Sequence, residues 1–149
     1  MPEATFAKFA PVESLQSTAY VVGRCDELCV ALNITKLQKL IYCCYGTVLG
    51  KFGMRLVDEH PVALRSLQFF GIDAFRGKAA PEAEALPAAV RAVIDETLEN
   101  FGKFGAEELS RWTRMTGSPW HRVTKGGASP YRTLCDEDIR NYFRAYVLL

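Results

Sequence analysis

The 149-residue sequence lacks long hydrophobic runs, blocks of like charge and a hydrophobic leader segment. No apolar run reaches the roughly 20 residues that a membrane-spanning helix requires, and the N-terminal residues have no signal-peptide core. The 18 Lys and Arg residues nearly balance the 17 Asp and Glu residues, so the net charge gives no reason to expect nucleic acid or an anionic membrane as the partner. We therefore expect a cytoplasmic protein that binds neither a membrane nor nucleic acid.

Metal and disulfide chemistry also have few candidate residues. The five cysteines are an odd number without regular spacing, the histidines number only two, and no CxxC pair is present. We therefore expect reduced thiols and no metal or other cofactor. Cys25 and Cys44 fall on apolar helical stripes, which predicts that both are small core residues. A zinc site that uses Cys25 and Cys29 is the alternative that their spacing leaves open.

What the sequence does contain is a strong helical pattern, clearest after residue 33. Thr35 and Gln38 have the spacing of a capping box, which predicts that a helix begins at Thr35. Two adjacent apolar stripes follow, formed by Leu37, Leu40, Ile41, Cys44, Val48 and Phe52 and by Gln38, Tyr42, Tyr45 and Leu49. They cover well over half of the helix circumference, so we expect this helix at the centre of a small helical domain. Gly46 and Gly50, on the remaining side, would let another backbone approach closely.

Four other segments also have helical spacing. We expect helices over residues 13–32, from Pro87 to about residue 101, over residues 106–115 and after Asp136, which would cap the last of them. The acidic side of the Pro87 helix is expected to face solvent.

Two segments lack that spacing. Residues 54–75 are poorly periodic, and both short extended pieces and a bent helix are compatible with them. Residues 120–132 are basic and rich in glycine, and we expect a loop there.

Together these patterns predict a mainly α protein. Residues 13–149 would form a single compact helical domain of about five to six helices, in which residues 54–75 could supply a short β element. Residues 1–12 show no clear period and are expected to form a loose arm. A chain of this length can bury roughly two thirds of its unfolded surface in one core.

Several short motifs occur in an order that suggests a family. They are residues 35–42 (TKLQKLIY), residues 56–59 (LVDE), Leu109-Ser110 with Thr113, Pro119-Trp120, and residues 136–139 (DEDI) with Tyr142-Phe143. In this order and spacing the chain resembles the Panacea domain family, which includes SocA-like antitoxins and phage-associated GepA-type proteins. Residues 63–69 lack the Trp and Gly-Pro that are usual in that family, and Arg114 stands where a His is common, so the chain resembles a divergent member.

The resemblance implies a function in protein binding. It implies an antitoxin, a small helical module that neutralises a cognate toxin encoded nearby through direct complex formation. The alternatives that it suggests are a phage or prophage interaction protein with another target and an adaptor that delivers its partner to a Clp-type protease. None of these roles needs catalytic residues, so we do not expect an enzyme.

We place the partner surface on the divergent and basic segments, roughly residues 55–75 and 111–132, rather than on the acidic side of the Pro87 helix. The candidate partner-binding residues are Lys36, Lys39, Tyr42, Arg65, Phe69, Arg111, Arg114, Trp120, His121 and Arg122. Lys36 and Lys39 could instead solvate the polar side of the central helix, and Trp120 could instead fill the core.

Two other functions stay open on the residues alone. Arg111, Arg114, Arg122, Lys125 and Arg132 are close in sequence to aromatic residues and could bind nucleic acid by stacking. An enzyme that pairs Cys135 with His121 is the other possibility, although no spacing motif brings this nucleophile and base together.

Overall fold

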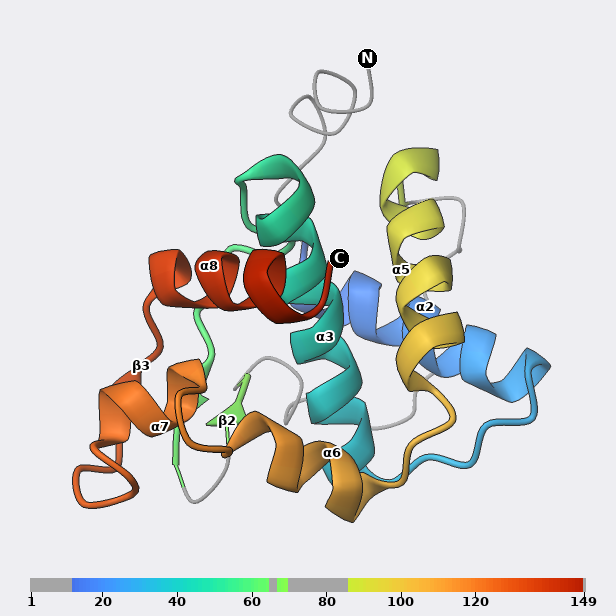
Figure 1. The fold of residues 1–149 in the computed structure, drawn as a ribbon. Coiled ribbons are helices and arrows are strands. Elements are labelled where there is room, and N and C mark those ends of the chain that lie inside the picture. The colour runs from blue at the N-terminus through green and yellow to red at the C-terminus, as the bar shows by residue number, and fades with distance from the viewer. Residues whose placement is uncertain (1–11, 65–66, 70–85, 149) are drawn as a thin grey trace.

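The computed structural model describes residues 12–64, 67–69 and 86–148, and its helices surround a single central helix (Figure 1). The described residues form six helices: α2 Ser14–Glu27, α3 Ile34–Phe52, α5 Ala88–Phe101, α6 Ala106–Thr113, α7 Pro119–Thr124 and α8 Asp136–Tyr146. A small sheet is the only other regular structure in these ranges. The expectation of a mainly α protein with a single compact helical domain is confirmed.

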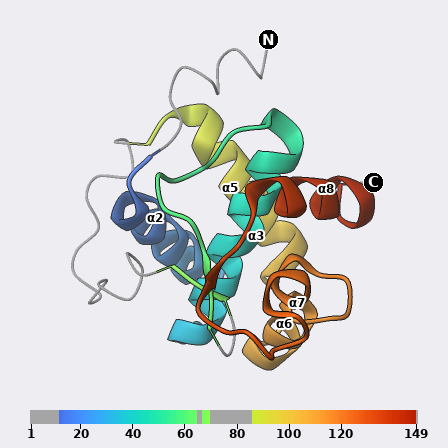
Figure 2. The ribbon, with the colours of Figure 1, turned by 90° about the vertical axis from the view of Figure 1, so that its left-hand side faces the viewer.

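Helix α3 forms the centre of the core. Every residue from 36 to 50 is buried, because α2, α5, α6 and α8 all pack against it. Figure 2 shows α2 and α8 on opposite sides of α3. The predicted central position is therefore confirmed, and the burial goes further than the two apolar stripes indicated.

The predicted close approach at the two glycines is made by side chains of the C-terminal region. A Cβ atom at Gly46 would clash with the Phe143 ring, and one at Gly50 would clash with the side chain of Leu148. In addition, Arg144 Nε donates a hydrogen bond to the carbonyl oxygen of Gly50 at 2.7 Å. Helix α8 can therefore lie directly across α3 because these two positions carry no side chain.

The predicted capping box is wrong. The N-cap of α3 is Asn33, whose side-chain oxygen accepts a hydrogen bond from the Lys36 backbone N–H at 2.8 Å. Gln38 instead points into the core, where its amide accepts from the Phe69 N–H at 2.8 Å and donates to the Phe69 carbonyl at 3.1 Å. Asparagine caps at least as well as threonine, and the tertiary contact with Phe69 recruits the Gln38 side chain that a capping box would need.

Helix α2 is shorter than the segment predicted from residue 13 to residue 32. It ends at Glu27, and Cys29 adopts a left-handed conformation with φ of 58°. Val21 and Cys25 of this helix are buried, whereas Leu28, which follows it, is 44% exposed. Before the helix, Val12 is buried and its N–H donates to the Leu56 carbonyl at 2.7 Å. Val12 thus belongs to the core, and the rest of the predicted arm lies outside the described residues.

The short β element expected in residues 54–75 is present. Strands β1 Val62–Ala63, β2 Leu67–Gln68 and β3 Arg132–Thr133 form an antiparallel sheet in the order β2-β1-β3, which lies next to α7 (Figure 1).

Part of the predicted 120–132 loop is wrong, because residues 119–124 form α7. Ser118 caps this helix by accepting from the His121 N–H at 3.2 Å, and Pro119 occupies the first turn, where its missing N–H costs nothing. The predicted cap of α8 is also wrong, since Cys135 occupies that position.

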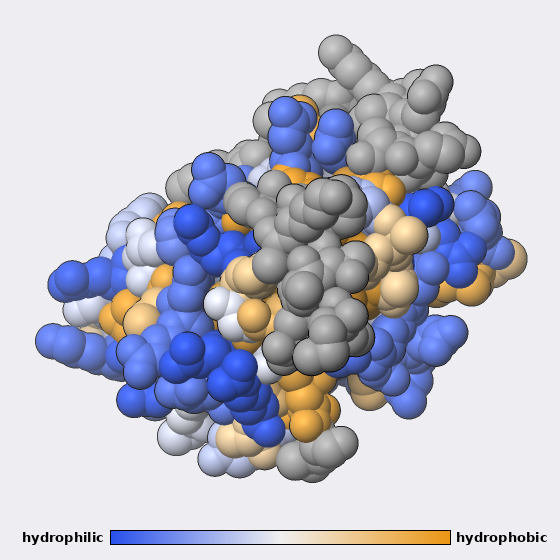
Figure 3. All heavy atoms as spheres, turned by 90° about the horizontal axis from the view of Figure 1, so that it is seen from above, coloured by the Kyte–Doolittle hydropathy of each residue, from blue (hydrophilic) through white to orange (hydrophobic). Residues whose placement is uncertain are grey.

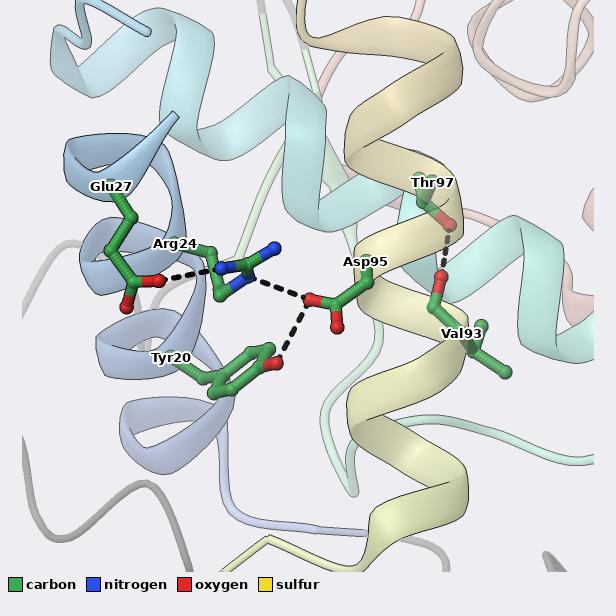
Figure 4. Close-up of polar contacts among 6 residues, drawn as sticks. All are labelled: Tyr20, Arg24, Glu27, Val93, Asp95 and Thr97. Atoms are coloured by element: carbon green, nitrogen blue, oxygen red, sulfur yellow. Dashed lines mark hydrogen bonds and ion pairs between the residues drawn. The ribbon is translucent and has the colours of Figure 1, made fainter. Parts of the chain in front are cut away.

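The acidic side of α5 is not simply solvated. Asp95 accepts hydrogen bonds from the Tyr20 hydroxyl at 2.8 Å and from Arg24 Nε at 3.0 Å, both on α2 (Figure 4). Glu96 pairs with Lys51 of α3 at 2.6 Å. Of the three acidic residues of α5, Asp95 and Glu96 therefore bind neighbouring helices, although this side of the helix was expected to face solvent.

The outer surface is mostly polar on the face in Figure 3, where hydrophilic residues surround smaller hydrophobic areas. Across the ranges described, no helix has the length and apolar character that crossing a membrane would require. The expected core placement of Cys25 and Cys44 is confirmed, whereas Cys29 and Cys135 are exposed.

Candidate partner-binding surface

Half of the candidate residues lie in the interior. Lys36, Lys39, Tyr42, Phe69 and Trp120 are all buried, so their side chains do not form an open contact surface. The Trp120 indole N–H donates to the Leu64 carbonyl at 3.1 Å, which fixes the ring between α7 and the sheet. The interpretation of Trp120 as a core residue is confirmed. The interpretation of Lys36 and Lys39 as solvated residues is wrong, because the helices packed around α3 leave both side chains buried.

Lys36 has a structural role that the sequence pattern did not indicate. Its ammonium donates to the carbonyl oxygen of Gly102, the C-cap residue of α5, at 2.8 Å. A cation at a helix C-terminus is stabilised by the carbonyl groups left without intrahelical partners. This contact joins the first turn of α3 to the end of α5 and so positions the connection that leads into α6.

The exposed arginines at the C-terminal end of α6, Arg111 and the C-cap residue Arg114, form a basic groove together with the start of α3. The groove has a volume of about 450 Å³ and is lined by Asn33, Thr35, Ala106, Glu107, Ser110, Arg111 and Arg114. Arg114 Nε lies 3.3 Å from the Ser110 carbonyl. Within the described part of the chain, neither Arg111 nor Arg114 is paired with a carboxylate. Both guanidinium groups are therefore positioned to meet an anionic group from outside.

The remaining candidate residues belong to α7 or lie outside the description. Arg122 is exposed and its Nη1 lies 3.7 Å from Asp138 Oδ1, which links α7 to α8. His121 is half-buried, next to Gly126. Arg65 lies outside the described residues. The structure thus brings Arg111 and Arg114 together in one groove, while His121 and Arg122 lie on the following helix.

A second cavity, of about 530 Å³, lies between the end of α3 and the start of α8 and was not anticipated from the sequence. It is lined by Leu49, Gly53, Met54, Arg55, Asp136, Glu137 and Arg140. The Tyr45 hydroxyl donates to Asp136 Oδ1 at 2.6 Å. Burial and this carboxylate raise the pKa of Tyr45, so the phenol stays protonated and continues to donate at neutral pH.

His60 completes the polar network at this cavity. Its Nε2 lies 3.0 Å from Arg55 Nη1, and its Nδ1 lies 3.5 Å from Asp136 Oδ1. Because a guanidinium can only donate, a hydrogen bond between Arg55 and His60 requires Nε2 as the acceptor, and Nδ1 faces Asp136. The network joins residues 45, 55, 60 and 136. Because residue 136 is far from the others in the sequence, no local motif could reveal these contacts.

A third hollow is aromatic and lies on the other side of α6. This aromatic groove has a volume of about 430 Å³ and is lined by Phe101, Phe104, Glu108, Leu109, Trp112, Tyr146 and Val147. Tyr146, which α8 contributes to this groove, is 70% exposed.

Two further observations bear on possible chemistry. Among the described residues, no group of three or more His, Cys, Asp or Glu side chains is arranged to hold a metal ion. Burial raises the pKa of the Cys44 thiol to about 12 and that of Cys43 well above its ordinary value, so these two thiols are not nucleophilic at neutral pH. The alternative of an enzyme based on Cys135 and His121 gains no support from a contact between them in the described chain, and the non-enzymatic prediction stays a prediction.

In comparisons with known proteins, no protein-family model, curated protein or solved structure matches the chain.

Proposed function

We propose that this chain is a protein-binding module of the antitoxin type, which neutralises a cognate toxin encoded nearby by forming a direct complex with it. The observation that carries the proposal is the basic groove between α6 and the start of α3. Two exposed guanidinium groups lie at a groove wall formed by regular helices. Arginine on a rigid surface is a residue type enriched where proteins recognise one another.

The nature of the groove further supports a protein partner. Arg111, in the last turn of α6, and Arg114, the C-cap residue that follows it, both line this groove. Ser110 and Asn33 add hydrogen-bonding groups beside them. Planar guanidinium groups bind carboxylates in a bidentate manner, so an acidic segment of the toxin is the fitting counterpart.

Co-expression tests this proposal. The product of the adjacent reading frame should arrest growth when it is produced alone, and this chain should restore growth. Affinity purification of a tagged copy of this chain should then recover both proteins as one complex. Recovery of this chain alone, without growth rescue, would refute the antitoxin function. Loss of the neighbouring protein only when a Clp-type protease is active would identify the chain as a proteolytic adaptor.

Charge reversal tests the contribution of the groove. The double variant Arg111→Glu/Arg114→Glu should weaken toxin binding at least about tenfold, because loss of a paired interface charge costs on the order of 1.4 kcal/mol or more. Glu99→Arg is the matched control, since Glu99 is an exposed residue of α5 that does not line the groove. Asp95 and Glu96 are unsuitable controls because they bind neighbouring helices. Equal loss of binding in both variants would place the contact elsewhere.

A further inference from the structure

Helix α6 separates two grooves that lie on opposite sides of it. Ser110 and Arg114 line the basic groove, whereas Glu108 and Trp112 line the aromatic groove. At about 100° per residue, Ser110 points roughly 180° away from the mean direction of Glu108 and Trp112 around the helix axis. A partner that fills the basic groove therefore leaves the aromatic groove open.

The aromatic groove is built on a series of packed rings that connects the buried Phe143 ring to the surface. The ring centroids of Phe101 and Trp112 are 5.5 Å apart, those of Trp112 and Tyr142 are 6.2 Å apart, and those of Tyr142 and Tyr146 are 5.0 Å apart. Trp112 and Tyr142 are half-buried, and Tyr146 is the exposed end of the series. Tyrosine and tryptophan held in this way offer a large contact area with little loss of side-chain entropy on binding.

The charge of the groove is carried by a single lining residue, Glu108. Its Oε1 accepts a hydrogen bond from the Gly105 N–H at 3.3 Å, which holds the carboxylate near the first turn of α6. The nearby Lys103 does not line the groove, and its ammonium lies 5.4 Å from the centroid of the Phe104 ring. A carboxylate beside an apolar groove favours a ligand with a cationic group next to its apolar part.

We propose that the aromatic groove binds a linear peptide segment of a protein partner, which places a large apolar side chain against Trp112 and Tyr146 and a Lys or Arg side chain against Glu108. The volume of about 430 Å³ accommodates one or two large side chains but not a folded domain. The inference rests on the proposed function only in that the partner is a protein, because the recognition chemistry is that of the groove alone.

The probe is a displayed library of random short linear peptides, selected against the full-length protein. The enriched peptides should combine a large apolar residue with Lys or Arg. The best of them, made synthetically, should bind Tyr146→Ala and Glu108→Arg at least about tenfold more weakly than the wild type, as loss of an interface hot spot implies. Glu99→Arg should bind it as the wild type does. Thermal unfolding of each variant shows that the fold is retained.

A charge swap gives the decisive result. When the basic residue of the selected peptide is changed to Glu, binding to the wild type should fall and binding to Glu108→Arg should recover. Absence of any enriched peptide that depends on both Tyr146 and Glu108, or enrichment of acidic peptides, would overturn the proposal. So would a wild-type dimer in sedimentation that Tyr146→Ala dissociates, because a second copy of the chain would then fill the groove. No peptide result bears on growth rescue, so this inference and the antitoxin proposal can fail independently.

Discussion

Asn33 holds the first turn of α3 through its side chain, and this role yields a test at a single residue. Asn33→Ala removes the hydrogen bond to the Lys36 N–H and should lower the free energy of unfolding by about 0.5–2 kcal/mol. Thr35→Ala should change it by less than about 0.5 kcal/mol, as expected for an exposed residue outside the cap. Denaturant unfolding of both variants measures the difference. A larger loss of unfolding free energy for Thr35→Ala than for Asn33→Ala would support the capping box that the sequence suggested.

Two polar residues of α3, Lys36 and Gln38, show why predictions for single residues from the sequence were wrong. Lys36 and Gln38 were assigned from local spacing, but their partners, Gly102 and Phe69, are 66 and 31 residues away in the chain. Helical periodicity reports which side of a helix is apolar. It carries no information on whether a polar side chain meets a distant backbone group, because that depends on how other elements pack.

At the scale of the elements, the crossing of α3 and α8 depends on the missing side chain at Gly46. Gly46→Ala should destabilise the protein by about 1–3 kcal/mol, because the added methyl group would overlap the Phe143 ring. Gly23→Ala is the matched control, since a Cβ atom there meets nothing within 4 Å. Gly23 is an exposed position inside α2, so its replacement should instead stabilise by about 0.5–1 kcal/mol. A stabilising Gly46→Ala would show that α8 can move away from α3 without cost.

The contact between α2 and α5 should depend on pH in the alkaline range. Burial and the Asp95 carboxylate raise the pKa of Tyr20 from 10.0 to about 12. The unfolded chain therefore releases this proton near pH 10 while the folded protein keeps it, so the stabilisation is complete below pH 10 and is lost as the pH rises towards 12. The difference in unfolding free energy between the wild type and Tyr20→Phe should shrink over that interval. A difference that stays constant from pH 9 to pH 12 would contradict the role of the hydrogen bond to Asp95.

On the scale of the whole molecule, periodicity predicted the mainly helical domain and the central helix correctly. The apolar stripes of α3, α5, α6 and α8 were recognisable because each repeats every three or four residues. The aromatic groove was not recognisable, because its walls come from three segments that are separate in the sequence. The basic groove was anticipated in part: Arg111 and Arg114 were selected from their sequence, but the start of α3 was not expected to face them.

The contact between α3 and α8 also has a consequence for how the protein is made. Gly50 and Arg144 are 94 residues apart, and at roughly 5–20 residues per second the ribosome needs roughly 5–20 s to synthesise the chain between them. During this interval α3 is complete, but the aromatic ring that fills its Gly46 position has not yet been synthesised. The part of α3 that α8 covers in the finished core therefore stays uncovered while α5 and α6, which pack against other parts of α3, are being synthesised.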